Sequence, residues 1–508
     1  MAQICVEALT FAYEGSFDNI FEKVSFSVDT DWNLGFIGRN GKGKTTFLNL
    51  LLGKYEYSGS IKTTAVFDYF PYHVTKEDMN RPAYELMEHW KPYVEDWRVL
   101  RELQPLKIDA ECMYRPFGTL SFGERTKIML AVLFSGENDF LLIDEPTNHL
   151  DKEARNLVKN YLKTKKGFIL VSHDRNVLDA CIDHVLVLNR SSIEVQAGNF
   201  SVWWENKERA DKNARAENAK HLKEIGKLEA AADRAGRWAK QNENTKIGFD
   251  PIKEHDRFLD TRAYIGAKTK KMQKRVKSYE NRIEREIEEK EGLLNDIEDV
   301  TELKLMPLPY YKERLIQARE FSLRYKDAKA SVFEPLTFEV KRGDRVFLRG
   351  ENGCGKSSLI KAILNTRERA GEGPCFETVG ELEVPQTLIL SYINQDTSHL
   401  SGMLSDYSDR MKLDHTLLLS LLRQLDFERT QFQKPMEQYS EGQKKKVLIA
   451  TSLLTPAHLY IWDEPLNYID IFTRMQIEKL ILKYQPTMIV VEHDVRFAET
   501  IATGVIDL

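Results

Sequence analysis

A glycine-rich loop that occurs twice is the feature that most constrains the fold of this chain. The first copy, Gly38–Thr45, reads G-x-x-x-x-G-K-[ST], follows the apolar pair Phe36-Ile37 and precedes a helical run. The second copy, Gly350–Ser357, follows Val346-Phe347-Leu348 in the same way. In such a loop, backbone N–H groups and the lysine surround phosphate oxygens, and the Ser or Thr hydroxyl binds Mg2+. The chain is therefore predicted to contain two phosphate-binding loops.

An apolar run that ends in two acidic residues also occurs twice. Phe140–Ile143 precedes Asp144-Glu145, and Leu459–Trp462 precedes Asp463-Glu464. Continuous apolar runs are typical of buried parallel strands. An aspartate at the carboxyl end of such a strand can hold Mg2+ through water, and the next glutamate can orient or deprotonate an attacking water molecule. Both pairs continue into similar strings, Pro-Thr-Asn-His-Leu-Asp and Pro-Leu-Asn-Tyr-Ile-Asp, which argues against a surface turn.

A histidine follows another apolar strand in each half of the chain. A single histidine would more often be structural, but the spacing of the motifs favours a functional pair. Gly38 and Gly350 are 312 residues apart, Asp144 and Asp463 are 319 apart, and His173 and His493 are 320 apart. This nearly constant separation predicts two copies of one α/β domain.

Residues 205–305, between the two copies, predict a charged helical hairpin. Apolar residues recur every three or four positions along the outgoing arm: Leu222, Ile225, Leu228, Ala232, Ala235 and Trp238. The return arm has the same pattern: Met272, Val276, Tyr279, Ile283, Ile287, Leu294 and Ile297. Between the arms, Gln241–Arg257 contains Gly248 and Pro251 and lacks a helical period, as expected of a hairpin tip. Arms of about 35 residues would reach roughly 50 Å.

The return arm is basic near the tip and acidic at its base. Eight Lys and Arg residues lie between Arg262 and Arg282, against the single acid Glu280, and the sign reverses beyond Arg285. A solvated linker is the plain alternative, because charge runs are usually solvated faces. A basic tip with exposed aromatic residues instead suits RNA. The predicted RNA-contacting residues are Phe249, Phe258, Arg262, Lys268, Lys270 and Lys271.

The overall composition is that of an ordinary globular protein. The 508 residues are enough for three or four domain-sized units, and a net charge of -5 gives no overall attraction to nucleic acid. The sequence has no run of eighteen apolar residues and no signal-peptide pattern, so a cytoplasmic location is expected. Five scattered cysteines without C-x-x-C spacing argue against a disulfide framework or a zinc site.

Two further strings complete a resemblance to the ATP-binding-cassette ATPases. Leu120–Glu124 and Tyr439–Gln443 look like the cassette signature, and their serines are again 319 residues apart. The resemblance implies that two cassettes close head to tail, so that the signature of one covers ATP held by the loop of the other. Ser121 and Gly123 would then meet ATP held by Lys356, and Ser440 and Gly442 would meet ATP held by Lys44.

The resemblance also assigns roles to individual residues. Tyr13 and Tyr325 would stack on adenine, His173 and His493 would contact the γ-phosphate, and Glu145 and Glu464 would orient the attacking water. The remaining ATP-binding residues would be Gly38, Asn40, Gly41, Gly43, Lys44, Thr45, Thr46 and Glu124 in the first half, and Gly350, Asn352, Gly353, Gly355, Lys356, Ser357, Ser358 and Gln443 in the second. Mg2+ would be held by Thr45, Asp144, Ser357, Asp463 and Gln395.

The predicted fold class is α/β, with two ATP-binding-cassette nucleotide-binding domains joined by a long antiparallel α-helical hairpin. The expected domains are residues 1–204, the hairpin 205–305 with its tip near 241–262, and residues 306–508. This arrangement looks like the ABC-F group. Three strings resemble the Lsa/Vga-type resistance proteins most closely: Arg115-Pro-Phe, Gly198–Ser201 and Leu459–Tyr468.

The resemblance implies a function on the bacterial ribosome. An ATPase using ATP and Mg2+ would bind the 70S ribosome and place its tip near the P-site tRNA and the 23S rRNA of the peptidyl-transferase centre. There it would displace lincosamide, pleuromutilin or streptogramin A antibiotics, directly or through nearby RNA. The chain would act as a monomer whose cassettes pair with each other, without a membrane subunit.

Two departures from the family pattern predict unequal ATP sites. The strand-end glutamine that senses Mg2+ matches Gln395 in the second half, whereas the first half has Tyr72, which cannot replace an amide ligand. Both signatures also lack their first glycine and have Phe122 and Glu441 instead, which changes how the backbone can approach a phosphate.

Three other functions are compatible with parts of the pattern. A general ABC-F translation factor shares every motif above. The ATPase subunit of a transporter would require a membrane partner and usually lacks a long charged hairpin. A DNA-organising ATPase would carry its coiled coil between the phosphate loop and the signature, where this chain leaves no room for one.

Overall fold

The computed structural model describes residues 3–13, 19–136, 139–148, 150–189, 192–244, 274, 277–278, 282, 304–326, 330–351, 353–366 and 376–508. Its contacts divide the chain into two compact units. One comprises Met1–Trp203 with Thr301–Leu508, and the other comprises Trp204–Val300. The first repeat (described residues within 3–203) and the second repeat (described residues within 304–508) both belong to the first unit. No helix among the described residues is both long and apolar enough to cross a bilayer.

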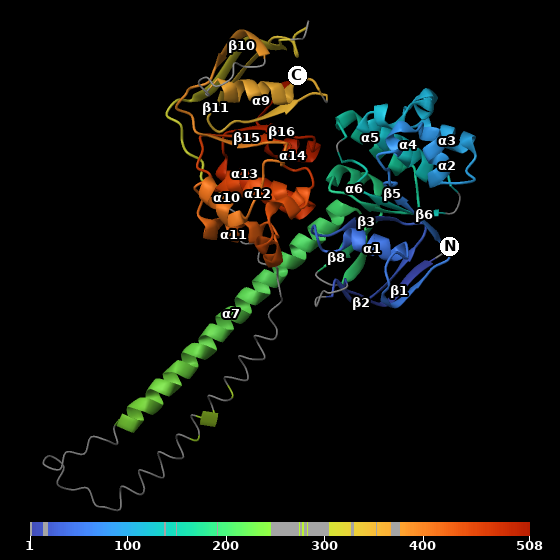
Figure 1. Cartoon of the computed structure of the whole chain (residues 1–508). Helices are drawn as coiled ribbons and strands as arrows, with labels where there is room; N and C mark the ends of the chain where they lie inside the picture. Colours follow the sequence, from blue (N-terminus) through green and yellow to red (C-terminus); the bar gives the residue numbers. More distant parts are fainter. Residues whose placement is uncertain are drawn as a thin grey trace, which may run out of the picture. The chain divides into compact units, whose positions relative to one another are not determined.

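The first repeat consists of two sheets with helices (Figure 1). The smaller sheet is antiparallel, in the order β2-β1-β4: β1 Gln3–Phe11, β2 Phe21–Asp29 and β4 Ser58–Lys62. The larger sheet has the order β5-β6-β7-β3-β8-β9: β3 Asn33–Ile37, β5 Val66–Phe70, β6 Asp139–Asp144, β7 Phe168–Val171, β8 His184–Leu188 and β9 Ile193–Ala197. All its pairings are parallel except that of β9.

The helices of the first repeat follow its strands and motifs. The α-helices are α1 Lys44–Leu51, α2 Ala83–Trp90, α3 Asp96–Leu103, α4 Phe122–Leu133, α5 Lys152–Lys163 and α6 Arg175–Cys181. Three short 3-10 helices are η1 Asp78–Asn80, η2 Ala110–Tyr114 and η3 Phe117–Thr119. Each α-helix that follows a predicted motif therefore starts at or directly after its functional residues.

The second repeat has the same architecture. Its antiparallel sheet has the order β11-β10-β13: β10 Arg314–Tyr325, β11 Leu336–Lys341 and β13 Phe376–Glu383. Its parallel sheet has the order β14-β15-β16-β12-β17: β12 Arg345–Arg349, β14 Leu390–Ile393, β15 Leu459–Asp463, β16 Met488–Val491 and β17 Gly504–Asp507. The helices are α9 Lys356–Asn365, α10 Leu404–Arg410, α11 His415–Gln424, η4 Arg429–Gln433, η5 Met436–Gln438, α12 Glu441–Leu454, α13 Ile471–Tyr484 and α14 Val495–Ile501.

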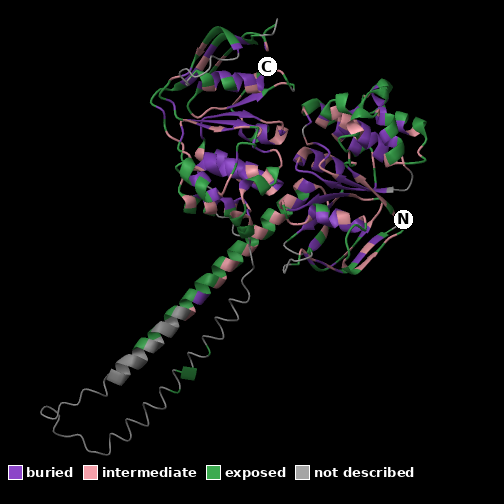
Figure 2. Cartoon of the chain, in the orientation of Figure 1, coloured by how far each residue is buried: buried purple, intermediate pink, exposed green. Residues whose placement is uncertain are grey.

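The strand β15 shows why the acidic motif is preceded by a continuous apolar run. Tyr460 and Trp462 belong to one hydrophobic core, whereas Leu459 and Ile461 belong to another. Successive side chains of a strand point to opposite faces of the sheet, so both faces of β15 are buried. Figure 2 shows the parallel strands of both repeats as buried. The prediction that each acidic pair ends a buried parallel strand is confirmed.

The outgoing arm of the predicted hairpin is the 45-residue helix α7, Phe200–Asn244. It begins before Glu205, because Asn199 accepts a hydrogen bond from the Val202 N–H (3.1 Å) through its side-chain oxygen, as a helix cap does. It also continues through Gln241–Asn244, which we predicted to belong to the non-helical tip; this prediction was wrong. Gln241 and Glu243 are good helix formers, and Asn242 and Asn244 are only weakly unfavourable in a helix, so these four residues can continue it.

The structure describes three side chains of the predicted apolar stripe of α7, and one of them does not fit the stripe. Ile225 is buried and Leu228 is half-buried, but Leu222 is exposed. Three residues turn a helix by about 300°, which leaves Leu222 at the edge of the stripe that Ile225 defines. The structure describes four exposed helical residues of the return arm, Lys274, Lys277, Ser278 and Arg282. The rest of that arm, the remaining stripe side chains of α7 and the predicted basic and aromatic tip residues lie outside its described part.

Candidate nucleotide-binding sites

The first glycine-rich loop lies between β3 and α1, as predicted. Gly43 precedes the helix with φ 104°, a left-handed conformation that favours glycine. The Lys44 Nζ group is buried and donates hydrogen bonds to the carbonyl oxygens of Gly38 (2.6 Å) and Arg39 (3.2 Å) and to the Asn40 side-chain oxygen (3.3 Å). The lysine therefore spans the loop that is expected to surround phosphate.

The second glycine-rich loop repeats this geometry between β12 and α9. Gly355 precedes the helix with φ 106°. The Lys356 Nζ group donates to the carbonyl oxygens of Gly350 (2.9 Å) and Glu351 (2.7 Å). Asn352, another predicted member of this loop, lies outside the described residues.

The predicted metal ligands meet in pairs at the carboxyl ends of the strands. Thr45 donates a hydrogen bond from its hydroxyl to Asp144 Oδ2 (3.0 Å), and Ser357 donates to Asp463 Oδ2 (3.1 Å). Burial raises the pKa of both aspartates above its ordinary value. In each repeat, motifs that are about one hundred residues apart in the sequence thus form one hydroxyl and carboxylate pair.

These pairs match the chemistry of a Mg2+ site. Mg2+ prefers oxygen ligands and is commonly held by one or two carboxylates together with phosphates. The Asp463 Oδ1 atom is buried and has no hydrogen-bond partner among the described residues, so it retains an acceptor for a metal-bound water. The residues present therefore fit Mg2+ and ATP phosphates.

The two predicted catalytic glutamates have different environments. His173 Nε2 lies 3.2 Å from Glu145 Oε1, and His493 Nε2 lies 3.6 Å from Glu464 Oε1. Glu464 also accepts hydrogen bonds at Oε2 from the side-chain amides of Gln395 (2.8 Å) and Asn467 (2.7 Å). The second repeat therefore orients its glutamate through more side chains than are seen to contact Glu145.

This difference changes the protonation of the two glutamates. Burial, together with the neighbouring Asp144 charge, raises the pKa of Glu145 to about 8. Burial alone would also raise the pKa of Glu464, but His493, followed by Lys445 and Asn467, holds it below its ordinary value. At neutral pH, Glu464 is ionised and suited to act as a base, whereas burial favours the protonated form of Glu145.

The register of the sheets shows which first-repeat residue corresponds to Gln395. Phe70 pairs with Ile143 on β6, and Ile393 pairs with Trp462 on β15. Counting two residues onward places Tyr72 at the position of Gln395. The Tyr72 hydroxyl donates to Asp68 Oδ2 (2.7 Å) and its ring stacks on Trp90, with centroids 5.0 Å apart.

Tyr69 is a site residue that our sequence analysis did not assign. Its hydroxyl donates a hydrogen bond to Asp144 Oδ2 (3.2 Å), the same atom that Thr45 contacts. The equivalent Tyr392 donates instead to Asn394 Oδ1 (3.3 Å). Aligning the two repeats would have paired these tyrosines, but only the folded sheet shows which partner each has.

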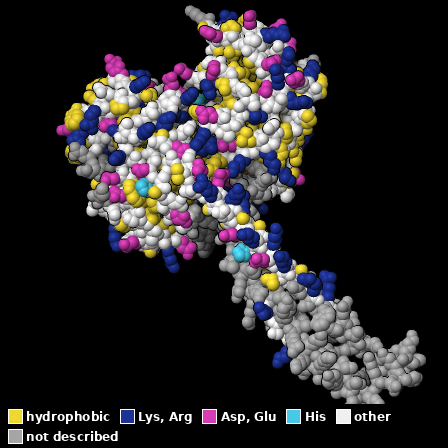
Figure 3. Space-filling view, turned by 180° about the vertical axis from the view of Figure 1, so that it is seen from behind, with side chains coloured by type: hydrophobic (Ala, Val, Ile, Leu, Met, Phe, Trp, Pro, Cys, Tyr) yellow, Lys and Arg dark blue, Asp and Glu magenta, His cyan; other side chains and the backbone are white. Residues whose placement is uncertain are grey.

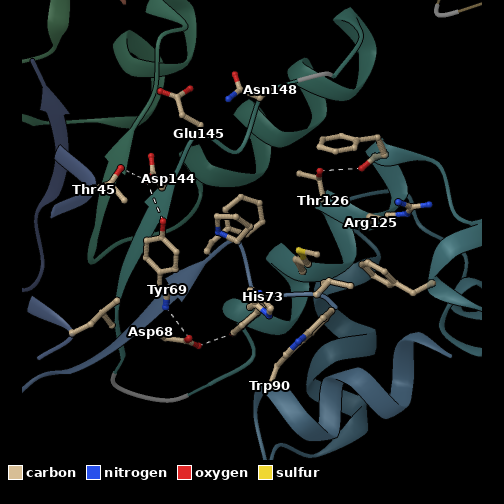
Figure 4. Close-up of a pocket in the computed structure, with 18 of the residues that line it drawn as sticks. Thr45, Asp68, Tyr69, His73, Trp90, Arg125, Thr126, Asp144, Glu145 and Asn148 are labelled. Atoms are coloured by element: carbon tan, nitrogen blue, oxygen red, sulfur yellow. Dashed lines mark hydrogen bonds between the residues drawn. The ribbon is translucent and has the colours of Figure 1, made fainter. Parts of the chain in front are cut away.

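A cavity of about 1090 Å³ adjoins the first site (Figure 4). Thr45, Asp144 and Glu145 line one part of it, and Trp90 and Arg125 line another. In Figure 4, the Tyr69 ring stands between Asp144 and Asp68, with its hydroxyl toward Asp144. Asp144 and Glu145 of the first site therefore face this cavity.

The predicted adenine-stacking tyrosines lie beside their loops. The hydroxyls of Tyr13 and Thr46 are 2.8 Å apart, as are those of Tyr325 and Ser358. Both tyrosine rings remain substantially exposed. A ring that is tethered next to a phosphate loop and open to solvent can offer its face to a base, so stacking on adenine remains a prediction.

Each predicted signature begins a helix. Ser121 caps α4 and Ser440 caps α12, each accepting from the backbone N–H of the third helical residue, and the side chains of Glu124 and Gln443 return the bond. This reciprocal capping explains the S-x-x-[EQ] pattern of both strings. It leaves Gly123 and Gly442 in the first turn of each helix.

One group of contacts between the repeats lies where the first loop meets the second repeat. Asn40 donates from its side chain to the Tyr468 carbonyl oxygen (2.7 Å). A Cβ atom on Gly442 would lie 2.7 Å from that same oxygen, so only glycine fits. Two ion pairs lie nearby, between Arg39 and Asp426 (3.0 Å) and between Lys42 and Glu428 (3.5 Å). The first glycine-rich loop and the second signature therefore both lie against the Tyr468 carbonyl group.

Comparisons with known proteins agree with this geometry. The family described as "ABC transporter" matches residues 21–148 and 333–467, which make up more than half of the chain. The chain belongs to this family and contains two ATP-binding cassettes.

Two of its relatives are members of the ABC-F group. It is 26% identical over 498 residues to the "Ribosome protection protein VmlR" of Bacillus subtilis (strain 168), covering 96% of this chain and 84% of that protein. It is 27% identical to the "Energy-dependent translational throttle protein EttA" of Haemophilus influenzae, over 76% of this chain and 63% of that protein.

Solved structures confirm the fold. The archaeal ribosome recycling factor aABCE1, in complex with the ribosomal stalk protein aP1, has a TM-score of 0.60 at 17% identity, covering 98% of this chain and 87% of that chain. At this identity, the likeness concerns architecture alone.

The protonation difference predicts opposite effects of two matched substitutions on stability. Because the pKa of Glu145 is raised, its contribution to stability is present at low pH and is lost as the pH rises through about 8. Glu145→Gln, which cannot ionise, should therefore raise the apparent Tm more at pH 9 than at pH 6, by about 2 °C or more. Glu464→Gln should lower Tm at pH 7. A glutamate whose pKa is lowered in the folded state stabilises the fold at pH values above its ordinary pKa, and this contribution is lost in the amide.

Thermal unfolding of the nucleotide-free protein in EDTA measures both effects. A Glu145→Gln gain that is the same at pH 6 and pH 9 would contradict the prediction.

Proposed function

We propose that this chain is an ABC-F ATPase that binds the bacterial 70S ribosome in its ATP-bound state and protects it from antibiotics. It inserts its hairpin near the P-site tRNA and the 23S rRNA of the peptidyl-transferase centre. There it displaces lincosamides, pleuromutilins and streptogramin A compounds and confers resistance. The observation that carries this proposal is the similarity to the ribosome protection protein VmlR over 96% of the chain.

Hydrolysis of ATP follows from the two sites. Lys44 and Lys356 would bind the phosphates, and Thr45 and Ser357 would help to hold Mg2+, which would neutralise phosphate charge. Glu464, ionised and oriented by Gln395 and Asn467, accepts a proton from the attacking water. Glu145 occupies the same position in the first site, but burial and the Asp144 charge raise its pKa and disfavour the ionised form that a base needs, so we assign most of the turnover to the second site.

ATP binding drives a change of conformation because it favours the state in which both repeats contact nucleotide. The contacts between Asn40 and the Tyr468 carbonyl and the position of Gly442 support a shared site between the first loop and the second signature. Closure would then bring Ser440 and Gly442 against ATP held by Lys44. Hydrolysis reverses the change.

The surface of α7 supports a nucleic-acid partner. Basic side chains outnumber acidic ones along its described part (Figure 3). The exposed basic residues are Arg209, Lys212, Arg215, Lys220, Lys223, Lys227, Arg234 and Arg237, and the exposed acids are Glu205, Glu208, Glu217 and Glu224. Cations spaced along a rod can contact the phosphate backbone of RNA. The tip residues Phe249, Phe258, Arg262, Lys268, Lys270 and Lys271 are proposed to reach the RNA beyond it.

The double variant Glu145→Gln, Glu464→Gln tests the partner. It should retain ATP but not hydrolyse it, and should therefore travel with 70S ribosomes in a sucrose gradient when ATP is present and not when it is absent. The matched control adds Lys44→Ala and Lys356→Ala to remove ATP binding. Failure of the folded, ATP-loaded double variant to comigrate would overturn the ribosome as partner.

A general translation factor is the second candidate, supported by the similarity to the translational throttle protein EttA. The two functions differ in their phenotypes. A resistance protein should raise the drug concentration needed to stop growth of a susceptible strain without changing drug-free growth. A translation factor should instead alter drug-free growth and polysome profiles when it is deleted.

A further inference from the structure

The beginning of α7 is bound to a carboxylate that both repeats share. Asp179 on α6 accepts hydrogen bonds at Oδ1 from the Ser201 backbone N–H (2.7 Å) and at Oδ2 from the Ser201 hydroxyl (2.6 Å). Arg496 on α14 of the second repeat donates to Asp179 Oδ2 (2.6 Å) and to the Ser201 hydroxyl oxygen (3.1 Å). One residue from each repeat and one from the first turn of α7 thus form a closed triangle, the Asp179 cluster.

Both helices of the Asp179 cluster start beside the histidines that are expected to contact the γ-phosphate of ATP. α6 begins directly after His173 and is capped by Asp174, which accepts from the Asn176 N–H (2.9 Å). α14 begins directly after His493 and is capped by Asp494 in the same manner. Asp179 is six residues from His173, or about 9 Å along a helix. A displacement of either histidine can therefore be carried rigidly to the start of α7.

The Asp179 cluster breaks the symmetry of the two repeats. The 320-residue separation of the histidines relates Asp179 to Glu499 and Arg496 to Asn176. An asparagine facing a glutamate cannot form the ion pair that Arg496 and Asp179 form. The sequence thus provides this ion pair only on the side where α7 starts, although both repeats contain the equivalent helix positions.

The energetics favour a positional role over a stabilising one. The Arg496 and Asp179 side chains are 36% and 20% exposed, and exposed ion pairs typically stabilise proteins by less than about 1 kcal/mol. Removing the guanidinium should therefore leave the fold intact. What it would remove is a direct side-chain bridge between α14 and the first turn of α7.

We propose that Asp179, Arg496 and Ser201 are positioning residues that couple closure of the two cassettes on ATP to the start of the hairpin helix. When ATP draws the repeats together, Arg496 moves with α14, and Asp179 with α6, and their common contact with Ser201 turns the first residues of α7. The proposal rests on the proposed function only in assigning the hairpin as the element that acts on a partner.

Hydrogen exchange in the free protein tests the coupling without any ribosome. In the Glu145→Gln, Glu464→Gln background, ATP with Mg2+ should change amide exchange in the first turns of α7, from Phe200 onward. Adding Arg496→Gln should abolish that change, and Asp179→Asn should do the same. The control Glu499→Gln, at the related position of the other repeat, should leave it intact.

Two further measurements distinguish a loss of coupling from a loss of ATP binding or of folding stability. Nucleotide affinity, measured with a fluorescent ATP analogue, and thermal stability should stay at the parent values in Arg496→Gln. Ser201→Ala, which keeps the backbone N–H contact and the ion pair, should give an intermediate exchange response. If Arg496→Gln retains the full ATP-dependent exchange response, or if the parent has none in α7, the proposal is overturned.

The ribosome provides an independent readout. Arg496→Gln should reduce the ATP dependence of ribosome binding by about 5-fold or more, a typical coupling between two sites. Loss of the exchange response without any ribosome binding in the parent would overturn the proposed partner and support the coupling. Ribosome binding by the parent, together with an unchanged exchange response in Arg496→Gln, would support the proposed partner and overturn the coupling.

Discussion

Replacing Glu464 with glutamine is expected to lower the rate of ATP hydrolysis by about 100-fold, the usual contribution of a positioned general base. Glu145→Gln should lower it less than about 3-fold by the same reasoning. Glu464 is ionised and held by Gln395 and Asn467. The raised pKa of Glu145 disfavours its ionised form, so its replacement by a neutral amide should change the rate little.

Steady-state phosphate release at saturating ATP and Mg2+ measures both rates. The wild type gives the highest expected rate, and the double variant gives the lowest. A useful second control is Gln395→Ala, which removes one of the groups that orient Glu464 and should lie between the two single variants. Equal losses in Glu145→Gln and Glu464→Gln would show that the different environments of the two glutamates have no bearing on turnover.

The largest effect on stability is expected from Arg474→Met. The Arg474 guanidinium is buried, lies 3.0 Å from Asp494 Oδ2 and donates to the carbonyl oxygens of Ile469 and Leu466 (both 2.9 Å). Removing one partner of a buried pair leaves the other charge uncompensated, at a cost of about 3–5 kcal/mol. The second repeat should therefore unfold at a markedly lower urea concentration.

Arg155 provides the matched control, because it occupies the related position of the first repeat. It lies 3.9 Å from Asp174, and both side chains are 12% exposed, against 7% and 1% for Arg474 and Asp494. Arg155→Met should therefore cost less than half as much. Urea unfolding followed by hydrogen exchange and mass spectrometry distinguishes the two repeats, and equal losses would contradict the difference in burial.

Much of the fold and of both sites could be predicted from the sequence, because the motifs are local and occur twice. A glycine-rich loop between an apolar strand and a helix has few conformations, and Gly43 and Gly355 both adopt the left-handed one. The spacing of acids and histidines predicted two equivalent α/β domains, and the family match confirms them. The apolar runs also predicted strands that are buried on both faces.

The boundaries of α7 could not be predicted in the same way. Helical period indicates which residues share a face, but Asn199 starts the helix through a side-chain cap and Gln241–Asn244 continue it without any apolar stripe. Leu222, which fits the period, is nevertheless exposed.

Side-chain partners were decided by the tertiary structure. The sequence shows that Tyr72 stands where Gln395 is expected, but not that Gln395 orients Glu464 or that the Tyr69 hydroxyl contacts Asp144. Nor does it show that Asp179, Ser201 and Arg496 meet, since they are up to 317 residues apart. The sequence by itself determined the local loops, strands and chemical groups. Which of these groups touch was decided only when packing brought distant segments together, because periodicity and spacing specify a face but not a partner.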